Sequence, residues 1–194
     1  MSIEIPGDIS VKRYFEEIVP QLFADELKSH PVQGMEGIDF KLQFTVTGEN
    51  GGTYSVIVKN GSELQVKEGD IHDAHVSFEL NEKDWRDSIT GKEGAGTVMD
   101  MFFNPSLLNR SKYDALVGVK GAMNLVLARE SGEPFKAKLK FNNTEIPTTT
   151  ISMKASEYAA MLKGQLNPVT AFMSGKLKIT GDMGLAMKLQ TFIK

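Results

Sequence analysis

The 194-residue sequence contains no cysteine. That absence excludes disulfides, thiol nucleophiles and cysteine-bound metals, and it fits a reducing compartment. An excess of one charge is also missing, because 22 basic and 25 acidic residues leave a formal net charge of −3. We therefore expect no nucleic-acid partner, since binding to a polyanion depends on a strong field of basic side chains.

Long apolar runs are absent as well, and none approaches the roughly 20 residues that a membrane-spanning helix needs. The first residues, MSIEIP, lack the basic region and the apolar stretch of a secretory signal. The composition, 41% hydrophobic and 24% charged, is that of an ordinary globular protein. We therefore expect a cytoplasmic protein that forms a single domain over residues 1–194.

Motifs of catalysis are missing too. The sequence has no Gly-x-Ser-x-Gly elbow, no His-Glu-x-x-His and no phosphate-binding glycine-rich loop. His72 and His75 lie close to Asp70 and Asp73, but positions three apart on an extended chain point to opposite faces. We interpret this stretch as a polar loop, and we expect no catalytic residue, no metal and no cofactor.

Apolar residues that are present follow clear periodicities. They recur at helical spacing from Val11 to Phe23, with Ser10 as the capping residue and Pro20 as an expected interruption. Strict alternation predicts strands that each have one apolar face, the first three forming a meander. The expected strands are 38–46, 54–58, 74–80, 116–119, 123–127, 135–141, 151–153 and 177–179, with further helices near 85–89, over 155–163 and from 182 onward.

Two parts of the sequence echo each other. When Phe78–Gly91 is aligned with Ile151–Gly164, Phe78 and Leu80 coincide with Ile151 and Met153, Trp85 with Tyr158, and Ile89 with Leu162. Chance similarity between two strand–helix units is the alternative. We predict an internal duplication on one continuous sheet, with a degenerate first copy over 10–127 and a second copy over 116–194.

The final helix has two apolar surfaces. From Asp182 onward, a spacing of about 100° per residue places Met183 and Met187 beside Gln190 and away from the other apolar residues. One surface can cover the sheet. The second can face protein core, a neighbouring subunit, or a ligand whose polar head lies near Gln190, because an apolar cavity with few polar groups is typical of small-molecule sites. The sheet-covering residues are Leu185, Ala186, Leu189, Phe192 and Ile193.

The same region carries a family resemblance. Ile151-Ser152-Met153, Glu157-Tyr158, Gly164, Asn167-Pro168 and the run from Ala171 to Gln190 resemble the C-terminal half of the sterol carrier protein type 2 family. The resemblance implies an α/β fold of the α+β type. In it, a mixed, mainly antiparallel β-sheet is covered on one face by helices, with an apolar tunnel between the layers.

The resemblance also implies a function. A member of this family binds fatty acid, fatty acyl-CoA, sterol or another lipid without catalysis, and transient membrane contact follows from such a role. By matching positions, the residues expected to line the lipid-binding tunnel are Met161, Leu162, Leu166, Phe172, Met173, Leu177, Ile179, Met183, Leu185, Met187 and Gln190.

One alternative to a carrier stays open. The chain is longer than a usual member of the family, and the extra residues around 93–141 could widen the sheet, enlarge the cavity or plug it. In the second hypothesis the protein is an interaction or regulatory module whose cavity is filled by its own side chains, with Phe102 and Phe103 as the plug. Such a module could use its outer surface to form a homodimer.

Overall fold

The computed structural model describes residues 5–91 and 109–190, except for the side chain of Gln190. Phe102 and Phe103, the plug of the second hypothesis, lie outside the described residues. The N-terminal part contains the short helix α1 (Val11–Arg13), the π-helical turn η1 (Tyr14–Ile18), α2 (Val19–Ser29), β1 (Asp39–Thr47), β2 (Gly52–Lys59), β3 (Glu63–Glu68), β4 (Val76–Asn81) and α3 (Glu82–Ile89).

The C-terminal part begins with a helix that precedes a hairpin. Its elements are α5 (Arg110–Val117), β5 (Gly121–Ala128), β6 (Phe135–Phe141), β7 (Thr148–Lys154), α6 (Ala155–Leu162), α7 (Pro168–Met173), β8 (Lys178–Gly181) and α8 (Met183–Gln190).

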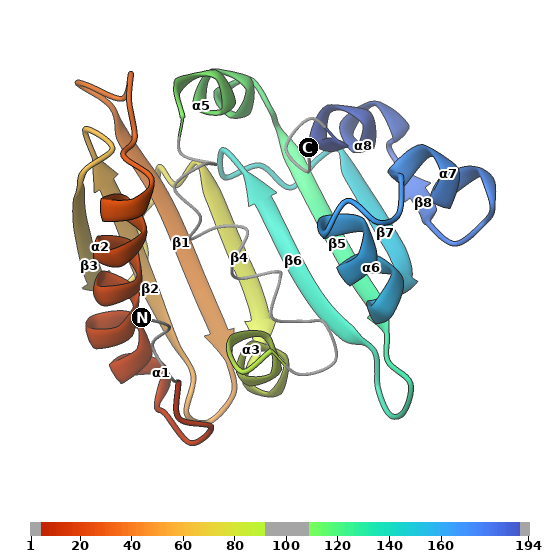
Figure 1. Cartoon of the computed structure of the whole chain (residues 1–194), viewed down its shortest axis with the longest axis horizontal. Coiled ribbons are helices and arrows are strands. Elements are labelled where there is room, and N and C mark those ends of the chain that lie inside the picture. Colours follow the sequence, from red (N-terminus) through yellow and green to blue (C-terminus); the bar gives the residue numbers. More distant parts are fainter. Residues whose placement is uncertain (1–4, 92–108, 191–194) are drawn as a thin grey trace.

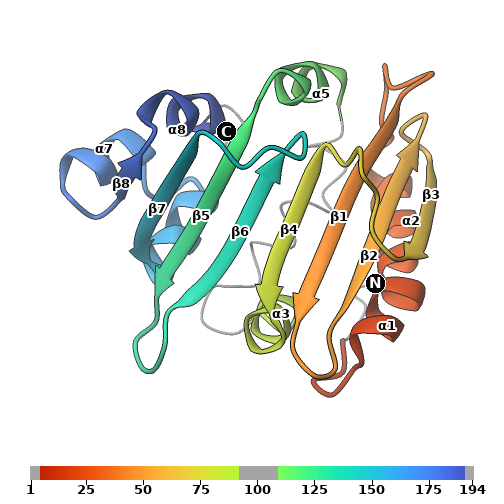
Figure 2. The ribbon, with the colours of Figure 1, turned by 180° about the vertical axis from the view of Figure 1, so that it is seen from behind.

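All described strands join one eight-stranded sheet in the order β3-β2-β1-β4-β6-β5-β7-β8. The pairs β1–β4 and β5–β7 are parallel, and the other five neighbouring pairs are antiparallel. Figure 1 shows α2, α6, α7 and α8 on one side of this sheet. In the reverse view of Figure 2 the strands stand in front of these helices. The expected mixed, mainly antiparallel sheet with helices on one face is confirmed.

The face of the sheet toward the helices is apolar because side chains alternate along each strand. One row runs across the sheet in register from Phe44 of β1 through Phe78 of β4 and Leu139 of β6 to Met123 of β5. On the opposite face, β6 presents Lys136, Lys138 and Lys140. The alternation Phe-Lys-Ala-Lys-Leu-Lys-Phe therefore fixes which face of β6 covers the core.

The two halves of the chain repeat one arrangement. In each, a hairpin (β1–β2 or β5–β6) is followed by a strand that pairs in parallel with the first hairpin strand, and then directly by a helix. Trp85 and Tyr158 are buried in the two helices, and Gly91 and Gly164 follow them with the same φ of 70°. Descent from one duplicated unit stays a prediction, but this arrangement supports it.

The halves meet at β6. This strand pairs with β5 of its own hairpin and, on its other edge, with β4 of the first half. In each half, one strand pairs in parallel with the hairpin, β4 in the first half and β7 in the second. The antiparallel neighbour of β4 is β6, and the antiparallel neighbour of β7 is β8, so β6 and β8 occupy corresponding positions. The strand β6 thus belongs to the strand arrangement of both halves, and for this reason the two halves form one continuous sheet.

Several sequence-based expectations were wrong in detail. Leu64 and Val66 belong to an additional edge strand, β3, so the first strands form no simple meander, and β4 crosses over to pair with β1. The segment 116–119 is no strand, because α5 continues to Val117 and β5 starts at Gly121. Helix α7, which starts after the capping residue Asn167, was not predicted.

The N-terminal helix is irregular next to Pro20. Helical backbone runs without a break from Val11 through η1 to Ser29, and Pro20, which has no N–H to donate, follows η1 directly in the first turn of α2. The preceding turn is π-helical, and the N–H of Val19 donates to the carbonyl of Tyr14. Within residues 5–91 and 109–190, no helix is long and apolar enough to cross a membrane.

Candidate functional site

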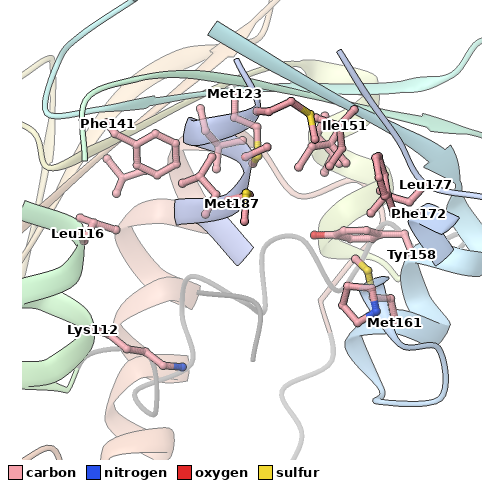
Figure 3. A pocket seen from close by; sticks show the side chains of 18 of the residues that line it. Lys112, Leu116, Met123, Phe141, Ile151, Tyr158, Met161, Phe172, Leu177 and Met187 are labelled. Atoms are coloured by element: carbon pink, nitrogen blue, oxygen red, sulfur yellow. The ribbon is translucent and has the colours of Figure 1, made fainter. Parts of the chain in front are cut away.

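A cavity of about 300 Å³ lies between the sheet and the helices of the C-terminal half. Figure 3 shows its extent, from Lys112, Leu116 and Phe141 at one end to Tyr158 and Met161 at the other. The floor consists of apolar side chains on β5, β6 and β7 that point to the helical face. The lining from the sheet and its edges is Phe40, Val76, Met123, Leu125, Leu139, Phe141, Ile151, Leu177 and Ile179.

The helices supply the roof and the rim. Asn167 caps α7 by accepting hydrogen bonds from the backbone of Val169 and Thr170, at 2.9 and 3.2 Å. Asp182 caps α8 in the same way, with 2.6 Å between its Oδ1 and the backbone nitrogen of Leu185. These caps fix where the two helices begin and hence which side chains reach the cavity. The helical and loop lining is Met35, Lys112, Tyr113, Leu116, Tyr158, Met161, Pro168, Val169, Phe172, Met183, Ala186, Met187 and Leu189.

The corresponding space in the N-terminal half is filled by aromatic rings. Phe15 stacks on Tyr54 with 4.7 Å between ring centroids, and Phe44 stacks on Phe78 at 4.8 Å. Tyr14 meets Trp85 edge-on at 5.5 Å. In the C-terminal half, the parallel pair that corresponds to Phe44 and Phe78 is Leu125 and Ile151, whose side chains are smaller. The difference in side-chain type accounts for a packed interior in one half and a hollow one in the other.

Tyr158 brings a polar group into the cavity. It is buried, and its hydroxyl points toward the middle of the cavity in Figure 3. Burial raises its pKa above the ordinary value for tyrosine, so the phenol is neutral near pH 7. The hydroxyl has no hydrogen-bond partner within residues 5–91 and 109–190. A hydroxyl that opens into an apolar cavity is placed to bond an oxygen of a bound molecule.

Among the described residues that line the cavity, Lys112 is the charged one. It lies on α5 and is half-buried, and burial lowers the pKa of its ammonium group. The other polar lining residue on this helix is Tyr113. One end of the cavity therefore carries a cation, while most of its length is apolar.

His75 helps to hold α5 against the sheet. Its Nδ1 accepts a hydrogen bond from the backbone N–H of Lys41 at 3.0 Å, and its Nε2 lies 3.5 Å from the hydroxyl oxygen of Tyr113. The imidazole also stacks on Phe40, with 5.6 Å between centroids. The loop before β4 is thus structural here, and within the described residues no group of three or more potential metal ligands occurs.

The residues expected from the sequence lie in different places. Met161, Phe172, Leu177, Ile179, Met183 and Met187 line the cavity. Leu162 and Leu166 are partly buried against the core, and Leu185 is buried, but none of these three reaches the cavity wall. Met173 points outward with 82% of its surface exposed, because α7 turns only its other face to the cavity. The side chain of Gln190 lies outside the described residues.

Other lining residues were missed by sequence reasoning. Lys112, Tyr113 and Leu116 come from a segment that was not expected to be helical, and Met35, Phe40 and Val76 come from the N-terminal half. Tyr158 carried a signal, because it coincides with buried Trp85 in the internal echo. The N-terminal residues reach the cavity only through the crossover of β4 and its pairing with β6, which local patterns do not encode.

Comparison with known families identifies the region that encloses the cavity. A family model described as the SCP-2 sterol transfer family matches residues 117–194. Residues 117–194 belong to the SCP-2 sterol transfer family. This SCP-2 region contains β5 to β8 and α6 to α8, and thus most of the cavity wall, while residues before it supply one end of the cavity.

Curated relatives agree with this assignment over short stretches. Sterol carrier protein 2 of Homo sapiens is 53% identical over 49 residues, which are 25% of this chain and 9% of that protein. Hydroxysteroid dehydrogenase-like protein 2 of Xenopus tropicalis is 35% identical over 96 residues, which are 45% of this chain and 22% of that protein. The chain thus spans less than a quarter of the length of either relative.

Among solved structures, the sterol carrier protein domain 2 of Helicoverpa armigera is similar. It has 24% sequence identity and a TM-score of 0.41, and the match covers 52% of this chain and 85% of that one.

Proposed function

We propose that this protein is a non-catalytic carrier that binds a fatty acid, fatty acyl-CoA, sterol or other lipid in the cavity of the SCP-2 region. The observation that carries the proposal is an apolar cavity of about 300 Å³ whose wall is built mainly by that region. Each methylene that leaves water for such a cavity contributes about 0.8 kcal/mol, so an alkyl chain binds without strong polar contacts. Residence in the cytoplasm, expected from the sequence, stays a prediction.

The polar groups of the wall favour a ligand with a small number of oxygens. The hydroxyl of Tyr158 points into the middle of the cavity, and the ammonium group of Lys112 lies at one end. A hydrocarbon would leave the hydroxyl of Tyr158 without a partner. A lipid with an ester, carbonyl, hydroxyl or carboxylate group can accept a bond from it.

The second candidate is an interaction module whose cavity is closed by its own side chains. The aromatic packing of the N-terminal half shows how this fold fills the same space with protein, as Phe15, Phe44 and Tyr54 do there. The carrier is favoured for the C-terminal half, because there the cavity is hollow among the described residues and lined by flexible side chains.

The test is a comparison of chain-length preference between variants. Leu139→Ala enlarges the cavity, because Leu139 forms part of its floor. Leu42→Ala is the matched control, since Leu42 is an equally buried leucine on the helical face of β1 and does not line the cavity. Each change is expected to lower the free energy of unfolding by about 2–5 kcal/mol. Ala186→Leu fills the cavity from α8 without removing any packing.

The readout is displacement of a fluorescent fatty acid by saturated fatty acids of increasing length. Affinity is expected to rise about fourfold per methylene until the cavity is full, since 0.8 kcal/mol corresponds to that factor. Leu139→Ala is expected to extend the rise by two or three methylenes, and Ala186→Leu to end it earlier, while Leu42→Ala leaves the length preference unchanged. Absence of probe binding by the unmodified protein would favour the interaction module.

A further inference from the structure

The cavity of the SCP-2 region is completed by residues that precede this region. Six of the lining residues lie before residue 117, and three of them come from the N-terminal half. Phe40 lies on β1 and Val76 on β4, and Val76 is directly opposite Phe141 of β6, where the two halves of the sheet meet. The third residue is Met35, in the segment before β1. One end of the cavity is therefore built in part by the N-terminal half.

Helix α5 forms the wall at this end and is fixed to the sheet by hydrogen bonds. The hydroxyl oxygen of Tyr113 lies 3.5 Å from Nε2 of His75, which precedes β4. Asn142, which follows β6, holds the C-terminal end of the helix, because its side-chain amide nitrogen lies 2.7–3.2 Å from three backbone carbonyl oxygens. The wall is therefore anchored on strands of both halves. The three carbonyl groups belong to Leu116, Val117 and Val119.

The two ends of the cavity differ in exposure. Toward α5, five apolar lining side chains are at most 9% exposed. On α7, Val169 and Phe172 also line the cavity, but 55% and 43% of their surface is exposed. Figure 3 shows Phe172 and Tyr158 at the end of the cavity opposite Leu116. The cavity is therefore closed toward α5 and open toward α7. The five buried residues are Met35, Phe40, Val76, Leu116 and Phe141.

This difference indicates how a bound lipid is oriented. A polar head group would lose its hydration among the buried side chains near α5, which is costly, whereas it stays hydrated at the exposed end near α7. Lys112 of α5 does not require an acidic head group there, because it has an interaction partner within the protein and burial lowers its pKa. The terminal methyl group of an alkyl chain therefore fits against α5.

We propose that Phe40, Val76 and Leu116 form the closed end of the lipid site and set the length of the alkyl chain that it accepts. The proposal rests on lipid binding as the function of the SCP-2 region. The N-terminal half, whose own interior is filled by aromatic rings, acts as a specificity element for the cavity of the other half. The ligand lies with its terminal methyl group against these three side chains and its oxygen atoms toward Tyr158 and α7.

Chain-length preference tests the closed end. In the full chain, Val76→Leu enlarges the wall and Phe40→Leu makes it smaller. Val46→Leu is the matched control, since Val46 is buried on the helical face of β1 and does not line the cavity. Saturated fatty acids of increasing length displace a fluorescent fatty acid, and the length at which affinity stops rising is compared. That length should fall by about one methylene in Val76→Leu and rise by about one in Phe40→Leu, so the affinity for the longest acids should change about fourfold. Val46→Leu should leave it unchanged.

Fluorescence quenching measures the orientation independently of affinity. The probes are two fatty acids of one length, with bromine on the terminal carbon or on the carbon next to the carboxylate. The tryptophan introduced by Phe40→Trp should lose fluorescence to the first acid and much less to the second, and the tryptophan introduced by Val169→Trp should show the reverse. The single native tryptophan, Trp85, is buried and does not line the cavity, so the unmodified protein gives the background.

The outcomes separate this proposal from the carrier function. If the unmodified protein binds fatty acids but Val76→Leu and Phe40→Leu keep its length preference, or shift it no more than Val46→Leu does, the closed end lies elsewhere and the carrier proposal stands. Stronger quenching of the Phe40→Trp variant by the acid with bromine next to the carboxylate also overturns the proposal, because the head group would then lie at α5. If the unmodified protein binds no fatty acid, both proposals fail.

Discussion

Asp84 of α3 and Arg129, which follows β5, form an ion pair with 2.7 Å between Oδ1 and Nη2, and their side chains are only 3% and 4% exposed. The other carboxylate oxygen of Asp84 accepts a hydrogen bond from the backbone N–H of Lys136 at 3.1 Å. Arg129 also donates to Asp87 at 2.8 Å. These bonds tie the N-terminal half to the β5–β6 hairpin of the SCP-2 region.

Removal of this carboxylate is expected to be costly. Asp84→Ala should lower the free energy of unfolding by about 3–5 kcal/mol, because Arg129 would remain as a buried charge that has lost a main partner. Lys83→Ala is the control, since it removes the ion pair between exposed Lys83 and Asp87 and should cost less than about 1 kcal/mol. Urea denaturation measures the free energy of unfolding of both variants. Equal losses of stability would contradict the role of the buried pair between Asp84 and Arg129.

Loss of the Tyr158 hydroxyl should affect ligands selectively. Tyr158→Phe keeps the ring and removes a hydroxyl that has no partner among the described residues. The affinity for a fatty acid or sterol whose oxygen bonds this hydroxyl should fall about three- to tenfold, since one hydrogen bond contributes about 0.5–1.5 kcal/mol. The affinity for a hydrocarbon of equal length should stay constant or rise. Calorimetric titration with both ligands decides, and an equal change for both would refute the hydrogen bond.

His75 makes stability depend on pH in a defined direction. Burial lowers the pKa of His75, the nearby charge of Lys41 lowers it further, and Asp73 opposes the shift. The native state therefore takes up this proton at a lower pH than the unfolded chain, whose histidine pKa is about 6.5. The free energy of unfolding should fall as the pH drops from about 7 through that value, and the fall should end below the folded-state pKa.

The matched variant for this prediction is His75→Asn, whose side-chain oxygen can still accept the N–H of Lys41. Urea titrations at pH 7.5 and 5.0 should show a smaller pH effect for the variant than for the unmodified protein. Asp73 and Glu145, whose pKa values are lowered by Lys41 and Lys138, lose their charge only at lower pH and are present in both proteins. The same pH effect in both proteins would exclude His75 as its source.

Much of the strand pattern could be predicted because burial of one face leaves a strict alternation. Phe135 to Phe141 is the clearest case, with four buried positions separated by three lysines. The edge strand β3 was missed because Leu64 and Val66 are only half-buried among charged neighbours, so the alternation is weak. The segment at Val117 was misread because β-branched residues there end a helix, and only the following Gly121 starts the strand.

The candidate site was only partly predictable, for a physical reason. Periodicity placed Ala186 and Leu189 on the side of the last helix that covers the sheet, but both line the cavity there, while Met183 and Met187 form its exposed rim. It could not show that Phe40 or Lys112 would reach the same cavity, because their approach depends on the pairing of strands far apart in the sequence. The positions matched to the family include neither residue.

Native mass spectrometry of protein purified without detergent shows directly whether the cavity carries a lipid. A carrier should have a mass above that of the polypeptide by one lipid, which is released by organic extraction and identified as a fatty acid, acyl derivative or sterol. Apo protein should regain that mass on addition of fatty acid. A spectrum of bare polypeptide, with no uptake of any apolar ligand after extraction and re-addition, would contradict the carrier.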